Sequence, residues 1–380
     1  MSRIDAGGNA PAPLPEAELL TGRVVGGSAS ARVSVDGRDY INFSGCGYLA
    51  LGRLPELRNA ALLALEQGAP FARQISAAYG AVDPAIRDLE STAAVYCGTG
   101  TAVYFASGYL IGAITLQCID TARSMLFIDS SAHFSLFDGA RLTGLPLTTF
   151  AHCDTEELAT VIRKNLPPRS RPIVITDGVF ATTGRLAPLD QYAAVIADYG
   201  GALVVDEAQS FGVIGPRGRG AAELLSVEAV ARTAATLSKA FCAQGALIGC
   251  DHEQAAKLRR SPPLRGANSG SPISAAVGSA ALNYTMAHPE RRARLATLTS
   301  YLRRRLRGIG IDVDDSPAPI VGFCVGDRAC MKALQRRLFD RGIHVTLSNY
   351  IGAGPQGMIR CAVFADHCEA DLDALVDGLR

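Results

Sequence analysis

The sequence of 380 residues is short of three features that would place it in a special class of protein. No apolar run approaches the roughly 20 residues that span a bilayer, and no basic stretch followed by an apolar core stands near the first residue. The ten cysteines form no C-x-x-C pair and show no other metal-ligand spacing. Lysine plus arginine number 37 against 36 acidic residues, a net charge of +1. We therefore expect no membrane segment, no metal site and no nucleic-acid-binding surface.

The cysteines indicate where the protein works. Most of them lie in apolar runs, where a free thiol behaves as a small hydrophobic side chain. Free thiols are typical of a reducing compartment. We therefore expect a cytoplasmic protein.

Lysine is also scarce, and one of the four lysines is in unusual surroundings. Lys164, Lys257 and Lys332 lie in polar segments, whereas Lys239 lies in the small, apolar stretch "TLSKAFCAQGALIGC" with no charged neighbour in sequence. Burial of an unpaired ammonium group favours the neutral amine, which is the form that condenses with aldehydes. The alternative is a lysine that extends to the surface from the end of an element.

Helical patterns alternate with short β-branched runs between residues 83 and 250, which predicts an α/β fold with a mostly parallel sheet covered by helices on both faces. In such a sheet, ligands bind beyond the carboxyl ends of the strands. The expected strands are 102–107, 124–129, 145–150, 171–177 and 202–208, and the expected helices are 83–98, 154–165 and 187–201.

Composition also divides the chain into parts. We expect an N-terminal arm over residues 1–42, a large domain over 43–275 and a small α+β domain over 276–380, with the Pro- and Ser-rich stretch 261–274 at the boundary. The small domain is expected to begin with one long helix, followed by strands at 318–325, 343–348 and 358–365, a helix at 331–342 and a final helix.

Two charged residues follow apolar runs of the large domain. Asp206 ends "ALVVD", and Lys239 follows "ARTAATLS" 33 residues later. An amine and a carboxylate at two strand ends, facing one crevice, are what a pyridoxal phosphate site requires: the amine binds the aldehyde and the carboxylate keeps the pyridine nitrogen protonated. The alternative for Asp206 is a helix cap.

Further candidates have structural alternatives that the sequence leaves open. His133 could stack on a flat cofactor ring or be an ordinary turn residue. Ser107 and Gly108, where a strand gives way to a helix, could present backbone amides to a phosphate. Arg360, inside a strand pattern, could bind a substrate carboxylate or form a structural ion pair.

Taken together, eight ordered segments resemble the α-oxoamine synthases, a family of fold-type I pyridoxal phosphate enzymes. The resemblance runs from about residue 40 to the C-terminus, and three of its segments look most similar to the synthases of α-hydroxyketone autoinducers. The segments are "NFSGCGYLALG", "YFASGYL", "IDSSAHFSLFDGAR", "FAHCDTEEL", "TDGVFATTGRLAPL", "VVDEAQSFGVIGPRGRG", "TLSKAF" and "IRCAVFADH".

The resemblance implies a role for each candidate and a decarboxylative condensation of an amino acid with an acyl thioester. The thioester belongs to coenzyme A or to an acyl carrier protein, and the enzyme is a homodimer with shared active sites. The resemblance implies that Lys239 binds the cofactor covalently, Asp206 pairs with its ring nitrogen and His133 stacks on the ring. It implies that Arg360 binds the amino-acid carboxylate. The implied phosphate-binding residues are Thr236, Ser107, Gly108, Tyr109 and, from the neighbouring subunit, Ser269.

The chain departs from the family pattern at four positions of the expected site. Gln209 replaces a histidine and still donates a hydrogen bond to the phenolic oxygen of the cofactor, and Cys46 replaces an asparagine near the substrate carboxylate. Ile86 and Ala181 replace a histidine and a serine. We therefore expect a pocket that is more apolar than is usual in the family. Because of these departures, transamination or another carbanion reaction is the alternative to acyl transfer.

Overall fold

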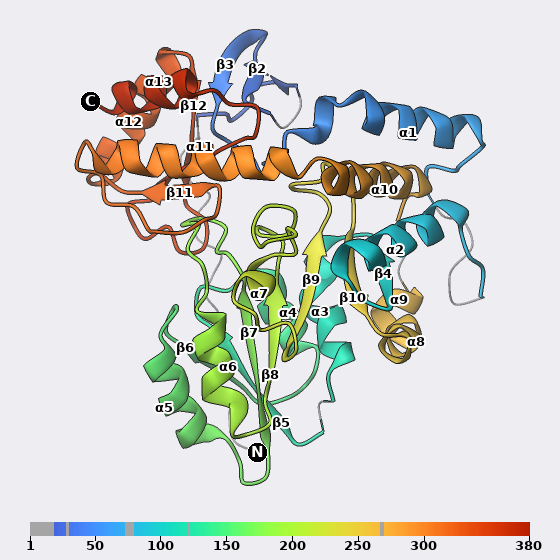
Figure 1. Ribbon diagram of the computed structural model, residues 1–380. Helices are drawn as coiled ribbons and strands as arrows, with labels where there is room; N and C mark the ends of the chain where they lie inside the picture. Colours follow the sequence, from blue (N-terminus) through green and yellow to red (C-terminus); the bar gives the residue numbers. More distant parts are fainter. Residues whose placement is uncertain (1–18, 28–29, 73–79, 121, 267–269) are drawn as a thin grey trace.

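The computed structural model describes all residues except 1–18, 28–29, 73–79, 121 and 267–269 (Figure 1). Its largest sheet has seven strands, which in spatial order are β4 (Thr101–Phe105), β10 (Ala246–Cys250), β9 (Ala231–Thr236), β8 (Ala202–Asp206), β7 (Arg171–Asp177), β5 (Ser124–Asp129) and β6 (Leu147–Phe150). Strand β10 is antiparallel to both of its neighbours, and all other adjacent pairs are parallel. The predicted α/β fold with a mostly parallel sheet is confirmed, and the sheet has seven strands.

Alternating side chains of the central strands enter two separate hydrophobic cores, one on each face of the sheet. In β7, Val174 packs into one core, and Ile173 and Ile175 pack into the other. Both faces therefore need a helical layer. The helices of this region are α2 (Pro84–Cys97), α3 (Ile111–Thr115), α4 (Phe134–Arg141), α5 (Thr155–Asn165), α6 (Leu189–Ala197), α7 (Ala221–Leu224), α8 (His252–Arg260) and α9 (Pro262–Gly266).

Two smaller sheets lie at the other end of the molecule. One contains β1 (Val25–Gly26), β2 (Arg32–Val35), β3 (Arg38–Asn42) and β12 (Ile343–His344), and the other contains β11 (Ile320–Phe323), β14 (Met358–Ala362) and β13 (Thr346–Ser348). Strand β3 pairs in parallel with β12, so the blue N-terminal strands of Figure 1 lie beside the red helices α12 (Arg328–Asp340) and α13 (Glu369–Leu379). Part of the expected arm is thus joined to the C-terminal region, and the boundaries at 42 and 275 stay a prediction.

Two of the expected elements are divided in the structure, so these predictions were wrong in detail. The single long helix is two helices, α10 (Pro272–Ala287) and α11 (Pro289–Arg307), because Pro289 lacks an amide N–H and restricts the residue before it. The strand expected at 343–348 is divided at Val345, since β12 pairs with β3 and β13 pairs with β14. Helix α1 (Pro55–Glu66) was not expected.

Two buried histidines join the N-terminal strands to the C-terminal region. His344 Nδ1 lies 3.2 Å from Asn42 Oδ1, and the ring of His367 stacks on Phe43 with centroids 4.5 Å apart. Burial lowers the pKa of each histidine to about 4. Both rings are therefore neutral in the folded protein and resist protonation there.

We expect these histidines to make the fold sensitive to acid. Above the ordinary histidine pKa of 6.5, both histidines are neutral in the folded and in the unfolded chain. As the pH falls towards 4, the unfolded chain binds a proton at each histidine and the folded protein does not, so the free energy of unfolding falls by up to about 3 kcal/mol for each. Urea unfolding between neutral pH and pH 4 measures this, and His367→Gln should flatten the pH dependence of the free energy of unfolding. The exposed His252 supplies the control substitution, His252→Gln; an unchanged profile in His367→Gln would contradict the prediction.

Candidate active site

The charged residues of the candidate site lie at the carboxyl ends of adjacent parallel strands. Asp206 ends β8 and Asp177 ends β7, and the two are partners in the parallel register. Both carboxylates are buried, and Asp206 accepts a 2.8 Å hydrogen bond from the amide of Ala208. Lys239 follows the next strand, β9, and is half-buried. The three residues therefore converge on the edge of the sheet where ligands bind.

The surroundings of Lys239 differ from the apolar pocket suggested by its sequence neighbours. Leu237 and Phe241 on either side are fully buried, but the positive charge of Lys239 acts on Asp206, Asp177, His133 and Cys46. The sequence analysis assigned Asp206, His133 and Cys46 to one site with Lys239 but missed Asp177. Lys239 therefore has carboxylates to balance its charge.

The two carboxylates differ in their affinity for protons. Burial raises the pKa of Asp206 to about 6, against the opposing effects of Lys239 and of the Ala208 amide. Burial and the negative charge of Asp206 raise the pKa of Asp177 further above its ordinary value. Asp206 is accordingly the member of the pair that gives up its proton more readily.

His133 is held in one orientation at the start of α4. Its Nδ1 accepts a hydrogen bond from the amide of Ser135, so the neutral ring carries its proton on Nε2, 2.8 Å from the hydroxyl oxygen of Tyr350. The His133 amide donates to Asp177 at 2.8 Å. Burial and Lys239 lower the pKa of His133. The ring is therefore neutral and lies beside the carboxylate pair.

The residues expected to hold a phosphate come together around Thr236. Gly108 packs so closely on Thr236 that an added Cβ atom would lie 2.9 Å from its hydroxyl. Ser107 caps the turn by accepting from the amide of Tyr109. Thr236 also bonds Ser238, a hydroxyl next to Lys239 that the sequence analysis missed. The expected partner Ser269 lies outside the described residues.

Arg360 is buried in β14, and its partners are not acidic. Its guanidinium donates to the carbonyl oxygens of Ala181 (2.7 Å) and Gly45 (2.9 Å), to the hydroxyl of Tyr48 (3.0 Å) and to Cys46 Sγ (3.5 Å). None of these partners, all within the described part of the chain, is a carboxylate. The structural ion pair, one of the two alternatives for Arg360, is therefore not formed in the described part of the chain. The guanidinium suits the other alternative, an anionic ligand.

Cys46 and Gln209 belong to the same group of hydrogen-bonded residues as Arg360 and Tyr48. The Tyr48 hydroxyl donates to Oε1 of the buried Gln209, which leaves the amide N–H groups of Gln209 to donate elsewhere. Burial opposes ionisation of Cys46, but Arg360 and Lys239 outweigh it and lower the pKa of the thiol. Cys46, Gln209, Arg360 and Lys239 therefore belong to one site.

The sequence analysis missed four members of this site, namely Tyr48, Asp177, Ser238 and Tyr350. Asp177 carried a signal, because "RPIVITD" ends in an aspartate just as "ALVVD" does. Tyr48 and Tyr350 carried none, since they join the site through contacts with residues far away in sequence.

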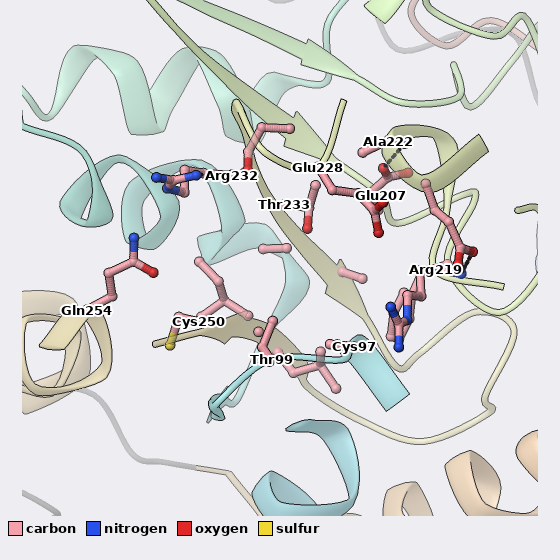
Figure 2. A pocket seen from close by; sticks show the side chains of 18 of the residues that line it. Cys97, Thr99, Glu207, Arg219, Ala222, Glu228, Arg232, Thr233, Cys250 and Gln254 are labelled. Carbon is pink, nitrogen blue, oxygen red and sulfur yellow. Dashed lines mark hydrogen bonds between the residues drawn. The ribbon is translucent and has the colours of Figure 1, made fainter. Parts of the chain in front are cut away.

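A cavity of about 360 Å³ lies elsewhere, along β9 and β10 (Figure 2). Two of its acidic groups are already bound: Glu223 pairs with Arg217 at 2.8 Å, and Glu207 accepts from two backbone amides of α7. Neither Lys239 nor Asp206 lines it. We therefore place the candidate site at the strand ends and assign no chemistry to this cavity.

Comparison with known proteins identifies the family. The sequence profile of the class I and II aminotransferases matches residues 39–379. The 8-amino-7-oxononanoate synthases of Geotalea daltonii and Alkaliphilus metalliredigens are 32% and 30% identical to the chain, over 94% and 93% of its length and 92% and 90% of theirs. The chain is an α-oxoamine synthase. The serine palmitoyltransferase of Sphingomonas wittichii has the same fold, with a TM-score of 0.86 at 25% identity, over 94% of this chain and 91% of that one.

This membership confirms the predicted family, cofactor and class of reaction. The α-oxoamine synthases are pyridoxal phosphate-dependent enzymes that transfer an acyl group from a thioester to an amino acid. The residues present in this α-oxoamine synthase fit the cofactor, because a buried carboxylate ends β8, an amine follows the adjacent strand β9, and a close turn faces Thr236. The part of the chain that the structure describes contains no helix long and apolar enough to cross a membrane.

Proposed function

We propose that this α-oxoamine synthase condenses an amino acid with an acyl thioester, using Lys239, Asp206, His133 and Arg360. One observation carries the proposal: Lys239 and Asp206 lie in one site with Arg360, a buried guanidinium whose partners in the described chain include no carboxylate. An amino-acid carboxylate provides the missing negative charge. Its amino group is then directed towards the position at which Lys239 holds the cofactor.

In this proposal each residue has one task. Pyridoxal phosphate supplies an aldehyde and an electron-accepting ring that stabilises negative charge on the α-carbon. Lys239 would hold the aldehyde through Nζ, and the same amine, when free, would accept the α-proton of the amino acid. Asp206 keeps the ring nitrogen protonated, and His133 lies against the ring and orients the reacting groups. Arg360 fixes the carboxylate of the amino acid.

The cofactor has further contacts in this proposal. Gln209 donates an amide N–H to the phenolic oxygen, since its carbonyl oxygen is engaged by Tyr48. The cluster around Thr236 receives the phosphate, with the turn at Ser107, Gly108 and Tyr109 supplying backbone amides and hydroxyls. Ser269 of a second copy is proposed to complete it.

We further propose that the enzyme is a homodimer that works in the cytoplasm. Support for a dimer comes from apolar side chains exposed on and just after α1, among them Leu63 (54% exposed) and Phe71 (80%). Exposed apolar patches of this kind are typical of interfaces. Support for a reducing compartment comes from the nine cysteines described, all of which are free thiols.

We expect the purified, cofactor-loaded protein to release thiol only when an amino acid and an acyl thioester are both present. A grid of amino acids against acyl-coenzyme A chain lengths, repeated with acyl carrier protein, measures this release and identifies both substrates. Omission of either partner is the control. Conversion of the cofactor to its pyridoxamine form by an amino acid alone, without thiol release from any donor, would contradict acyl transfer and establish transamination.

A further inference from the structure

Tyr48 lies at the point where three distant segments of the chain meet. It stands in the segment after β3, Gln209 follows the end of β8, and Arg360 lies in β14. The amide of Ala365 donates to the Tyr48 carbonyl oxygen at 2.8 Å and holds this segment against the residues that follow β14. The Tyr48 side chain is completely buried. Its hydroxyl therefore has to find its hydrogen-bond partners within the protein.

The Tyr48 hydroxyl has one proton, and its neighbours decide where that proton points. Arg360 Nη2 donates to the Tyr48 oxygen at 3.0 Å, and a guanidinium has no acceptor to offer in return. The proton is therefore directed to Gln209. The Gln209 atom that faces Tyr48 must then be the acceptor Oε1, because the amide nitrogen carries only donors. Tyr48 thus fixes which way round the Gln209 amide lies.

The thiol of Cys46 is the other polar group beside this hydroxyl. Its Sγ lies 3.5 Å from Arg360 Nη2, and Cys46 and Arg360 are the charged groups that act on Tyr48. Burial, together with the negative charge of an ionised Cys46, raises the pKa of Tyr48 well above its ordinary value. The hydroxyl accordingly keeps its proton at neutral pH. Because sulfur is a weak acceptor, the amide oxygen of Gln209 is the better partner for that proton.

The orientation of Gln209 matters because the two ends of its amide have opposite hydrogen-bonding properties. With Oε1 engaged by Tyr48, the N–H groups of Nε2 are left to donate to the phenolic oxygen of the cofactor. An amide turned round would place its oxygen against that phenolic oxygen, and two acceptors repel each other. Arg360 strengthens the correct arrangement, because a hydroxyl that accepts from a cation becomes a stronger donor itself.

We propose that Tyr48 is a positioning residue that joins the amino-acid-binding arginine to the cofactor-binding glutamine, through a chain of hydrogen bonds from Arg360 to Tyr48 to Gln209. The inference rests on the functions proposed above for Arg360 and Gln209. In this chain Tyr48 fixes the guanidinium for the carboxylate of the amino acid and the amide for the phenolic oxygen, before either ligand binds.

The same chain accounts for glutamine at position 209, where the family pattern has a histidine. A neutral imidazole presents one acceptor and one donor on opposite sides of its ring. An amide whose oxygen is held by Tyr48 presents the same pair of groups in a fixed order. Gln209 can therefore replace the imidazole as a link between Tyr48 and the cofactor, without the ability to titrate.

The first test is a pH titration of the absorbance of the bound cofactor, which follows the proton shared between its phenolic oxygen and the nitrogen of Lys239. A donor to the phenolic oxygen withdraws negative charge from it and weakens its hold on that proton. Tyr48→Phe frees the Gln209 amide to turn round, so the midpoint of the titration should rise by about 0.5–1 pH unit, the loss of one neutral hydrogen bond.

The matched control is Tyr96→Phe. It also removes a buried hydroxyl that donates within the protein, to the carbonyl of Gly218 at 3.3 Å, but it lies outside the candidate site. Its midpoint should equal that of the wild type. Folding of each variant is checked by circular dichroism, and each is studied as the full-length, cofactor-loaded protein.

Variants at Gln209 separate positioning from a general loosening of the fold. Gln209→Leu removes the donor, so it should raise the midpoint as Tyr48→Phe does, and the double variant should go no further than Gln209→Leu alone. Gln209→His restores an acceptor and a donor and should keep the wild-type midpoint. The shift caused by Tyr48→Phe should persist when Cys46 is also replaced by alanine, since it does not come from the thiol.

A second readout tests the other end of the chain without any acyl donor. Tyr48→Phe removes one of the groups that hold the Arg360 guanidinium. The amino-acid concentration that gives half of the spectral change should therefore rise by about 3–10-fold. Tyr96→Phe should leave this concentration unchanged.

An unchanged midpoint or an unchanged amino-acid affinity in folded, loaded Tyr48→Phe would overturn the proposal. Effects of Tyr48→Phe and Gln209→Leu that add in the double variant would overturn it equally. Failure of the proposed function is a separate result, because both readouts use the cofactor and the amino acid alone. A wild-type protein that shows these effects but releases no thiol would contradict acyl transfer and still support the chain through Tyr48.

Discussion

Replacing Lys239 with alanine is expected to abolish thiol release, lowering kcat by about 10⁴-fold or more. In the proposed roles of Lys239, the substitution removes the amine that holds the cofactor aldehyde and also the base that accepts the α-proton, and loss of a general base alone costs about 10²–10⁴-fold. Thiol release under saturating substrates measures the effect. The absorption spectrum of the bound cofactor should change as well, because the covalent link to the protein is lost.

The matched control for this prediction is Lys257→Ala. Lys257 is an exposed lysine of α8 whose Nζ donates to the carbonyl of Ile119, outside the candidate site, so its removal should leave kcat unchanged. Turnover close to wild type in Lys239→Ala, with the protein folded and loaded, would exclude Lys239 as the reactive amine.

The second large effect is expected at Asp206. Asp206→Asn keeps the shape of the side chain and removes its charge, so the ring nitrogen loses the carboxylate that keeps it protonated. An ion pair at about 4 Å in surroundings of intermediate dielectric is worth about 4 kcal/mol, which corresponds to a loss of roughly 10²–10³-fold in kcat. Steady-state kinetics with saturating cofactor measures it.

The pH profile of cofactor affinity separates a charge effect from a structural one. The pKa of Asp206 is raised to about 6, so in the wild-type protein the carboxylate is lost to protonation as the pH falls through 6 and affinity should fall with it. In Asp206→Asn affinity should be low at every pH and free of this transition. The exposed Asp198→Asn is the control, and a transition near pH 6 that persists in Asp206→Asn would assign it to another group.

The sequence was most informative where a proposed site residue lies at the end of a strongly patterned strand. The positions of Asp206 and Lys239 at one edge of the sheet could be predicted because each buried run has a clear boundary, and parallel strands bring such boundaries to one edge. Asp177 has the same pattern and was read only as the end of a strand. Every aspartate at the end of a buried strand is therefore a candidate site residue, including one that has no place in a known arrangement.

The contacts of Arg360 could not be predicted in the same way. Its partners come from residues 45–48 and from Ala181, and no local pattern links these segments to β14. The resemblance to a family placed Cys46 near the substrate carboxylate, but only the structure shows its sulfur on the guanidinium. The divided helix at Pro289 shows the opposite case, since a residue with a known local effect was overlooked.

The pairing of β3 with β12 has a consequence for how the protein is made. Residues 38–42 emerge from the ribosome first and must await residues 343–344, roughly 300 positions later, which takes about 15–60 s at ordinary rates of synthesis. The central sheet, between residues 101 and 250, is complete well before then. Tyr48 and Arg360 likewise meet only at the end of translation. The carboxyl ends of the central strands are therefore in place first, and the pocket proposed for the amino acid is completed last, because a chain that stops short of β14 has no Arg360.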